Sequence, residues 1–194
     1  MAAKKTTLLI ILAAVLIVLA GCGSGSSKEK LPDQVQKAKD NAMKAVQNSA
    51  HEMEGSWVDR VANLESYAKN GDAADTAEYK SLQGDLADYA NEFKADRLYV
   101  MAVKNDEYLI VLDTAKGTSW HDKAVIDVEA ADKAYSDGLI SAEHTGWQAN
   151  DKYYWTAYSP LYNQNNEIAF VLGADKSRKK LADYPDWLSE KGGE

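Results

Sequence analysis

The sequence has few of the residues that hold covalent bridges or metals. It contains one cysteine and three histidines among 194 residues. A single cysteine excludes an internal disulfide, and a zinc site would need carboxylates beside the histidines, whose spacing matches no metal-ligand pattern. With only three prolines and 45% hydrophobic residues, the composition is that of a globular domain. We expect neither a metal nor a cofactor.

Positive charge and catalytic motifs are also scarce. The 22 Lys and Arg residues are outnumbered by 30 Asp and Glu residues, which gives a net charge of −8. This balance excludes a sequence-independent nucleic-acid binder, because binding phosphates requires a basic surface. The sequence contains no Gly-x-Ser-x-Gly elbow, His-Glu-x-x-His helix, glycine-rich phosphate loop or nucleophilic cysteine. We therefore expect a protein that is not an enzyme.

The N-terminus carries the most specific signal. Lys4 and Lys5 precede an uncharged apolar run from 8 to 20, which is shorter than the about 20 residues of a membrane-spanning helix. Leu19-Ala20-Gly21-Cys22 follows, and it resembles the lipobox of bacterial lipoproteins. The resemblance implies cleavage before Cys22 and acylation there, palmitate included, on the extracytoplasmic side of the cell membrane. The alternative is an uncleaved signal anchor with an incidental cysteine.

These features divide the chain into four parts. Residues 1–21 form a lipoprotein signal peptide, and residues 22–32 form a flexible tether rich in Gly and Ser. Residues 33–178 form a single domain, and residues 179–194 form a charged C-terminal tail.

The first half of the domain has helical periodicity. Apolar residues recur every three or four positions from 33 to 68, and Asn70-Gly71 ends the pattern. This spacing predicts one long helix, whose first half is long enough to project as a stalk. A second helix begins near Asp75 or Thr76, with Glu78 three residues after Asp75 as in a capping box. We expect both helices to pack on a sheet rather than in a coiled coil.

The second half has the short apolar runs of a sheet. Residues 98–103 and 108–113 flank one polar turn, and residues 153–162 and 168–174 flank another, which predicts two antiparallel hairpins. A short helix over 129–136 lies in the segment that crosses between them. The predicted fold class is α+β, an antiparallel sheet with a long N-terminal helix and a second helix packed on one face.

The closing hairpin resembles that of Cache domains, the PAS-like extracytoplasmic sensor modules of bacterial receptors. Its aromatic first strand ends in Pro160-Leu161, and its apolar second strand ends in Gly173-Ala174-Asp175. Ser119-Trp120-His121 stands where many members carry Pro-Trp-Tyr after the first hairpin. The resemblance covers residues 33–178. It implies a PAS-like fold with a small-molecule pocket between the sheet and the crossing segment, about 117–147.

The resemblance also bears on the class of ligand. Amino-acid-binding members place an arginine about two residues before the tryptophan, and this chain has Gly117-Thr118 there. A ligand carboxylate would therefore lack its bidentate guanidinium partner. Asp151 matches roughly the position of a family acidic residue that holds a ligand amine. The resemblance thus implies a cationic or amine ligand.

The stretch from 99 to 162 is rich in aromatic residues, which supply apolar area and directed O–H and N–H groups to a cleft. A cation against such rings would gain about 0.5–2 kcal/mol per contact. Alternation puts Trp155 and Tyr158 on opposite faces of their strand. We expect Trp155 in the pocket and Tyr158 packed under the helices, and the opposite orientation is the alternative. Asp175 has a structural alternative, fixing the exit of its strand. The candidate ligand-binding residues are Tyr99, Trp120, His121, Trp147, Asp151, Tyr153, Trp155 and Asp175.

The function that follows is a lipid-anchored extracytoplasmic lipoprotein that binds a small molecule. The residues after Asp175 include no apolar run, so we expect it to act through a separate membrane receptor or transporter. The alternative is a Cache-like lipoprotein without a ligand, which binds another envelope protein as an accessory or inhibitor.

Overall fold

The computed structural model describes residues 33–67, 73–115, 120–124, 126, 128–149 and 152–178. The predicted signal peptide, the tether with Cys22 and the C-terminal tail lie outside the described residues, so their boundaries stay predictions. Within the described residues, no helix combines the length and the apolar character needed to cross a membrane.

Helix α2 (Asp33–Met53) ends earlier than the periodicity predicts. Gly55 takes a φ of 71°, in the left-handed region that glycine adopts at little cost, and its N–H donates to the carbonyl of Tyr162 at 2.9 Å. The chain then continues as two short helices, α3 (Ser56–Ala62) and α4 (Leu64–Tyr67). The prediction of one helix as far as residue 68 is therefore wrong. The apolar spacing runs through a break that a glycine and a bond to the sheet impose.

A short 3-10 helix, η2 (Ala73–Asp75), leads into α5 (Ala77–Glu92). The side chain of Thr76 caps α5, because its Oγ1 accepts a backbone N–H of the first turn at 3.1 Å. The predicted start of this helix is confirmed. The predicted capping box is not formed, since Glu78 instead accepts a hydrogen bond from Arg60 Nε at 2.7 Å.

The sheet has five antiparallel strands in the spatial order β2-β1-β5-β4-β3. The strands are β1 (Arg97–Lys104), β2 (Glu107–Asp113), β3 (Ser141–Ala149), β4 (Lys152–Tyr162) and β5 (Ile168–Arg178). Both predicted hairpins, β1–β2 and β4–β5, are confirmed. Asn105 and Asp106 both have positive φ, as the two-residue turn favoured between antiparallel strands requires.

The crossing segment differs in part from the prediction. Helix α6 (Val128–Asp137) forms as expected and is followed by Gly138 at a φ of 66°. Strand β3 follows, and the sequence does not predict it, because its residues show no regular alternation of apolar and polar side chains. It forms against the edge of β4, where backbone pairing from Ser141 to Thr145 supplies the contacts.

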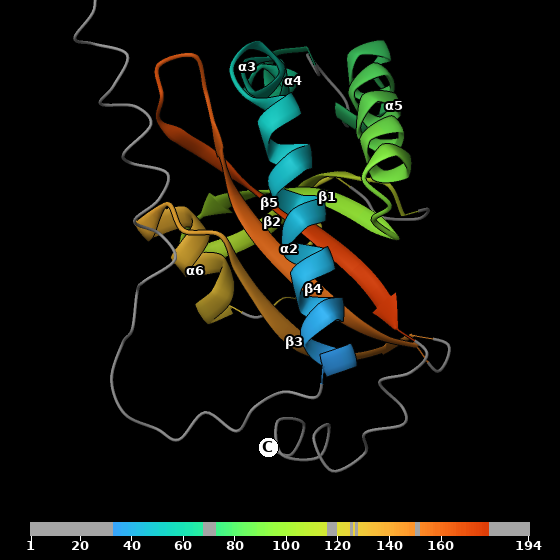
Figure 1. The fold of residues 1–194 in the computed structure, drawn as a ribbon. Coiled ribbons are helices and arrows are strands. Elements are labelled where there is room, and N and C mark those ends of the chain that lie inside the picture. Colours follow the sequence, from blue (N-terminus) through green and yellow to red (C-terminus); the bar gives the residue numbers. More distant parts are fainter. Residues whose placement is uncertain are drawn as a thin grey trace, which may run out of the picture. The chain divides into compact units, whose positions relative to one another are not determined.

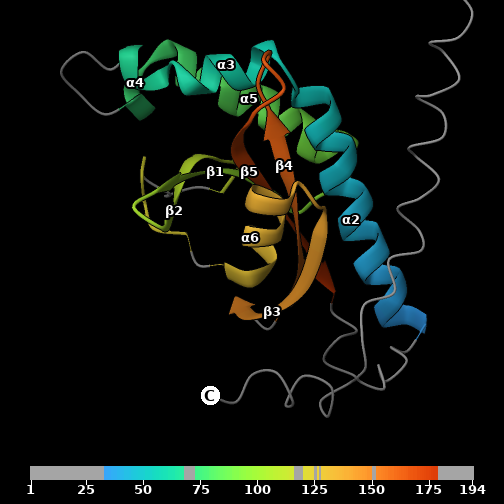
Figure 2. The ribbon, with the colours of Figure 1, turned by 90° about the vertical axis from the view of Figure 1, so that its left-hand side faces the viewer.

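The two faces of the sheet carry different helices. Helix α2 packs on β4 and β5, and α5 packs on β1 and β2 (Figure 1). Helix α6 packs on the opposite face, and Figure 2 shows α2 and α6 on either side of β4. The α+β class with its first helices on one face is therefore confirmed. The face covered by α6 holds the polar residues described next.

Candidate functional site: a buried ion cluster on the α6 face

Strand register brings two rows of cross-strand neighbours together on the face that α6 covers. The first row contains Arg97, Asp175 and Thr156. The second row contains Asp113, Tyr99, Gly173 and Tyr158. Paired residues of antiparallel strands share a face, and so do residues two positions apart on one strand. The side chains of Arg97, Tyr99, Asp113, Thr156, Tyr158 and Asp175, which we call the Arg97 cluster, therefore project from the same side of the sheet.

Arg97 and Asp113 form the strongest contact of the cluster. Arg97 begins β1 and Asp113 ends β2, and their side chains meet in a bidentate pair: Nε donates to Oδ1 at 3.0 Å and Nη2 donates to Oδ2 at 2.5 Å. The Asp113 side chain is only 1% exposed and that of Arg97 is 23% exposed. Such planar pairing is the geometry in which a guanidinium binds a carboxylate most tightly.

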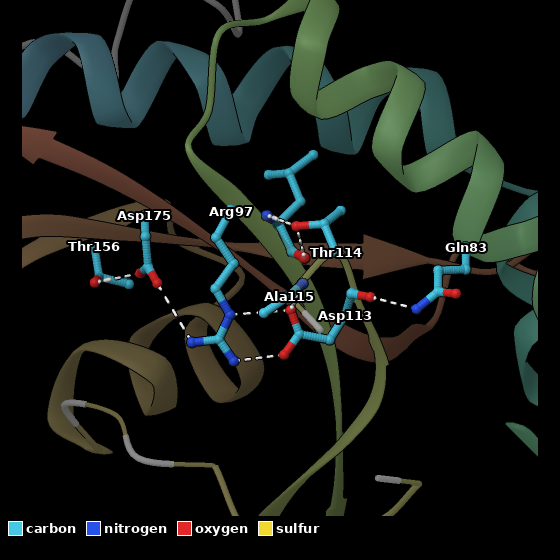
Figure 3. A network of polar contacts seen from close by, with 8 residues as sticks. Gln83, Arg97, Asp113, Thr114, Ala115, Thr156 and Asp175 are labelled. Atoms are coloured by element: carbon cyan, nitrogen blue, oxygen red, sulfur yellow. Dashed lines mark hydrogen bonds and ion pairs between the residues drawn. The ribbon is translucent and has the colours of Figure 1, made fainter. Parts of the chain in front are cut away.

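Asp113 also fixes the backbone around it (Figure 3). Its Oδ1 accepts the N–H of Ala115 at 2.7 Å, and its own carbonyl accepts a hydrogen bond from Gln83 Nε2 of α5 at 2.8 Å. The next residue, Thr114, accepts the N–H of Leu98 at its Oγ1. The end of β2 is thereby connected to β1 and to a helix on the other face of the sheet.

Asp175 is the second carboxylate of the cluster. Its Oδ1 accepts a hydrogen bond from Thr156 Oγ1 at 2.7 Å, and its Oδ2 lies 3.6 Å from Arg97 Nη1, a looser ion pair. Burial raises the pKa of Asp175 to about 6, although Thr156, Arg97 and a hydrogen bond from Tyr99 act in the opposite direction. A carboxyl in this condition changes charge near neutral pH.

Tyr99 lies between these charges and the sheet. The guanidinium of Arg97 stands over its ring, with 4.6 Å from Cζ to the ring centroid, a cation–π contact. Burial raises the pKa of Tyr99 well above its ordinary value, so the hydroxyl stays protonated and serves as a donor. Tyr158 neighbours it across Gly173 and is fully buried.

Helix α6 closes over this face with small residues. Ala130, Ala131 and Ala134 are fully buried against an aromatic cluster that includes Tyr99 and Tyr158. The hydroxyl of Tyr108, in the same cluster, donates to Asp132 of α6 at 2.6 Å, and Ser141 Oγ donates to the carbonyl of Ala130 at 2.6 Å. Hydrogen bonds from Tyr108 to Asp132 and from Ser141 to Ala130 thus hold the helix to the sheet.

Two of the candidate residues, Tyr99 and Asp175, belong to the Arg97 cluster. Trp155 does not, because its buried ring lies beneath α2, where Lys39 Nζ is 5.4 Å from the ring centroid. The expected orientation of β4 is therefore wrong: Tyr158, and not Trp155, projects toward α6. Alternation fixes only that the two residues lie on opposite faces, and the apolar face of α2 is what draws Trp155 to its side.

Trp120 and His121 lie at the β2 edge, apart from Trp155. The Trp120 ring meets the ring of Tyr79 on α5 edge to face, with centroids 6.0 Å apart. His121 follows at a φ of 63°, its ring 4.7 Å from that of Trp120 and its Nε2 3.5 Å from Lys104 Nζ. The expected gathering of Trp120 and Trp155 around one cation is not formed. Asp151 and the side chains of Trp147 and Tyr153 lie outside the described residues.

Sequence reasoning missed Arg97, Asp113, Thr156 and Tyr158 as site residues. A signal for two of them was present. The predicted hairpin of 98–103 and 108–113 brings its two ends together, so a basic residue before its first strand and an acidic residue at the end of its second strand are candidates for an ion pair. In the described part of the chain, no group of three or more His, Cys, Asp or Glu side chains is placed to hold a metal.

Neither protein-family models nor curated proteins match this chain. Solved structures do match. The sensor domain of Escherichia coli DcuS has a TM-score of 0.52 at 9% identity, covering 77% of this chain and 98% of that one. The sensory domain of the Campylobacter jejuni chemoreceptor Tlp3 with isoleucine bound has a TM-score of 0.37 at 17% identity, covering 82% and 64%. The periplasmic domain of Chlamydia trachomatis RsbU has a TM-score of 0.39 at 9% identity, covering 78% and 59%.

The match to the DcuS sensor domain extends over nearly that whole domain and most of this chain. Together with the five-stranded antiparallel sheet and its helices, it shows that this chain has a PAS- and Cache-like α+β fold.

Proposed function

We propose that this protein is a lipid-anchored extracytoplasmic lipoprotein that binds a small cationic or amine solute through Asp175 and acts through a separate membrane partner. The observation that carries the proposal is the Arg97 cluster. A sensor-type fold here buries a carboxylate with a raised pKa on the face that α6 covers. Raised carboxyl pKa values at buried positions occur preferentially at functional sites.

The electrostatics of the cluster favour a cation. Arg97, Asp113 and Asp175 together carry one positive charge and two negative charges when both carboxyls are ionised. A bound ammonium group near Asp175 would offset part of the cost of ionising a buried carboxylate. The Tyr99 ring already carries the guanidinium of Arg97, 4.6 Å from Cζ to the ring centroid, so the carboxylate of Asp175 is the group that would receive an added cation. The cluster therefore suits an amine better than an anion.

The N-terminal sequence supports the proposed location. Leu19-Ala20-Gly21-Cys22 follows an apolar run in the manner of a lipobox. Acyl chains contribute about 0.8 kcal/mol per buried CH₂, and two or more chains hold a protein durably on a membrane. The tether from 22 to 32 would let the domain reach a partner in the same membrane.

A binding domain without a catalytic motif transmits information by changing shape. A solute that binds one arrangement of α6 and the crossing segment more tightly shifts the population toward that arrangement. The membrane partner, a receptor or transporter, would read the surface that results. We therefore propose a binding protein rather than an enzyme.

A ligand screen tests the binding proposal. The thermal stability of the full chain in detergent is measured against amines, amino acids and carboxylates at matched ionic strength. A ligand at one hundred times its dissociation constant adds about 2.7 kcal/mol of stability. We expect hits among amines, and we expect Asp175→Asn to abolish them. A broad library with no hits, or hits that Asp175→Asn leaves unchanged, contradicts the proposal.

Anchoring has its own test. Cells that express the chain with and without Cys22→Ala are labelled with a palmitate analogue and fractionated. We expect label and membrane association in the original chain, and loss of the label with accumulation of unprocessed chain in the variant. Equal labelling of the two chains contradicts a lipid anchor at Cys22.

A second candidate function is a ligand-free interaction lipoprotein that binds another envelope protein. The observation that favours it is the use of two expected pocket residues in packing, Trp155 beneath α2 and Trp120 against Tyr79. The two functions separate in one comparison. For a ligand-free interaction protein, the original chain and the Asp175→Asn variant would cross-link to the membrane partner equally well, with or without added amines.

A further inference from the structure

Asp175 already has a cation beside it in this structure. Arg97 Nη1 lies 3.6 Å from Asp175 Oδ2, while Thr156 occupies the other carboxylate oxygen at 2.7 Å. Figure 3 shows the guanidinium of Arg97 between the carboxylates of Asp113 and Asp175. A solute amine that approaches the Oδ2 side of Asp175 therefore meets Arg97.

The guanidinium is held unequally by its two carboxylates. It donates two hydrogen bonds to Asp113, at 3.0 and 2.5 Å, whereas the distance to Asp175 is that of an ion pair without a short hydrogen bond. The Asp113 end is also the fixed end, since Ala115 and Gln83 bind the same residue. Separating Arg97 from Asp175 thus disturbs much less than separating Arg97 from Asp113.

We propose that Arg97 is the resident counter-cation of Asp175 and the specificity-determining residue of the site, which a solute cation displaces from Asp175 while Asp113 retains the guanidinium. This inference rests on the proposed binding of a cation. Arg97 then acts as an internal competitor. A solute binds only if it is a better partner for Asp175 than the loosely held guanidinium. This competition selects compact ammonium groups over neutral polar solutes.

The structure also indicates what binding would change. The guanidinium is planar and rigid, so Nη1 leaves Asp175 only when the whole group turns, and it then stays paired with Asp113 through one of its two present bonds, from Nε or from Nη2. The side chain of Arg97 is 23% exposed, so part of it is in contact with solvent. The exchange therefore requires a small rotation of one side chain and leaves the strands in place.

Removal of the internal cation tests this role. Arg97→Ala removes the guanidinium from between the two carboxylates, and methylammonium chloride, a compact ammonium, serves as the probe. Binding is measured by titration calorimetry on the full chain in detergent, against sodium chloride at equal ionic strength. We expect Arg97→Ala to bind methylammonium at least about tenfold more tightly than the original chain does. Equal binding by the two proteins overturns the proposal.

Double variants identify the carboxylate that receives the probe. We expect Arg97→Ala/Asp175→Asn to lose the gain in affinity. If that double variant binds methylammonium as tightly as Arg97→Ala does, Asp113 alone receives the cation and the proposal is wrong. A failed solute screen on the original chain would contradict the proposed function, whereas these titrations report on Arg97 and Asp175 whatever the screen finds.

A milder variant covers the case in which Arg97→Ala does not fold. Arg97→Gln keeps an N–H donor for Asp113 and removes the positive charge. Because the charge of Arg97 favours ionised Asp175, we expect the carboxyl pKa of Asp175 to rise in this variant, read from its carboxyl-carbon NMR signal. An unchanged titration of Asp175 shows that Arg97 is not its counter-cation.

Discussion

The ring of Tyr99 lies directly over Gly173 of the neighbouring strand. A Cβ added at Gly173 would stand 2.3 Å from Tyr99 Cζ, a distance at which the ring must move. Glycine is thus required two residues before Asp175, because only a bare backbone lets the ring lie flat beside the carboxylates. The glycine of the Gly-x-Asp sequence in β5 therefore has a physical basis in the packing of Tyr99, although the strand continues beyond Asp175 to Arg178.

Gly173→Ala is expected to destabilise the domain by about 1–3 kcal/mol, the usual cost of overpacking a core. Gly84→Ala on α5 is the matched control, since nothing lies within 4 Å of its added Cβ. We expect this control to stabilise the domain by about 0.4–1 kcal/mol. Urea denaturation of both variants checks the pair. Equal stability of Gly173→Ala and the original chain would show that Tyr99 does not occupy this position.

Asp113→Asn is expected to cost about 3–5 kcal/mol of unfolding free energy, because it leaves a partly buried guanidinium without its bidentate partner. The control is Glu107→Gln. It breaks an ion pair with Lys123 of nearly the same length, 2.7 Å, between two exposed side chains. Exposed pairs contribute about 0–1 kcal/mol. Similar losses in the two variants, measured by urea denaturation, would contradict the assigned importance of the buried pair.

Thr76→Ala is expected to cost about 1 kcal/mol, since it removes the side-chain oxygen that accepts a backbone N–H at the start of α5. Asp75→Ala should cost less, because Asp75 ends η2 and is not the cap. Chemical denaturation of the two variants distinguishes them. A larger loss of stability from Asp75→Ala than from Thr76→Ala would indicate that Asp75 caps α5, as the sequence pattern suggests.

Local signals were sufficient for much of the fold. The β1–β2 hairpin follows from apolar runs on either side of Asn105-Asp106, and α6 follows from its periodicity and Gly138. These elements depend on residues that are close in sequence. The break at Gly55 was not predictable in the same way, because its hydrogen bond goes to Tyr162, which is distant in sequence.

The candidate site was predictable only in part. Tyr99 and Asp175 carry sequence signals of their own, an aromatic strand position and a Gly-x-Asp sequence. Arg97 and Asp113 acquire their role from the register of β1 with both of its neighbours. The face toward which Trp155 projects depends on which side of the sheet α2 covers, and strand alternation does not contain that information.

The pH dependence of stability gives a test centred on Asp175. Its pKa is raised from 3.8 to about 6 in the folded protein, chiefly by burial, so the folded state binds this proton more tightly than the unfolded chain does. The contribution of this group to stability is therefore fully present below pH 3.8 and is lost as the pH rises through about 6. Since each pKa unit corresponds to about 1.4 kcal/mol, the whole change is about 3 kcal/mol.

The difference in unfolding free energy between the original chain and Asp175→Asn isolates this group, because the other carboxyls titrate in both proteins. We expect the original chain to lose stability relative to the variant as the pH rises from 4 to 7. Above about pH 7 the difference between the two should stay constant. Urea denaturation at closely spaced pH values measures it. If the difference is independent of pH, or if the original chain gains stability relative to the variant, Asp175 is ionised in the folded protein throughout this range. That result would remove the electrostatic argument for a displaceable cation at Asp175.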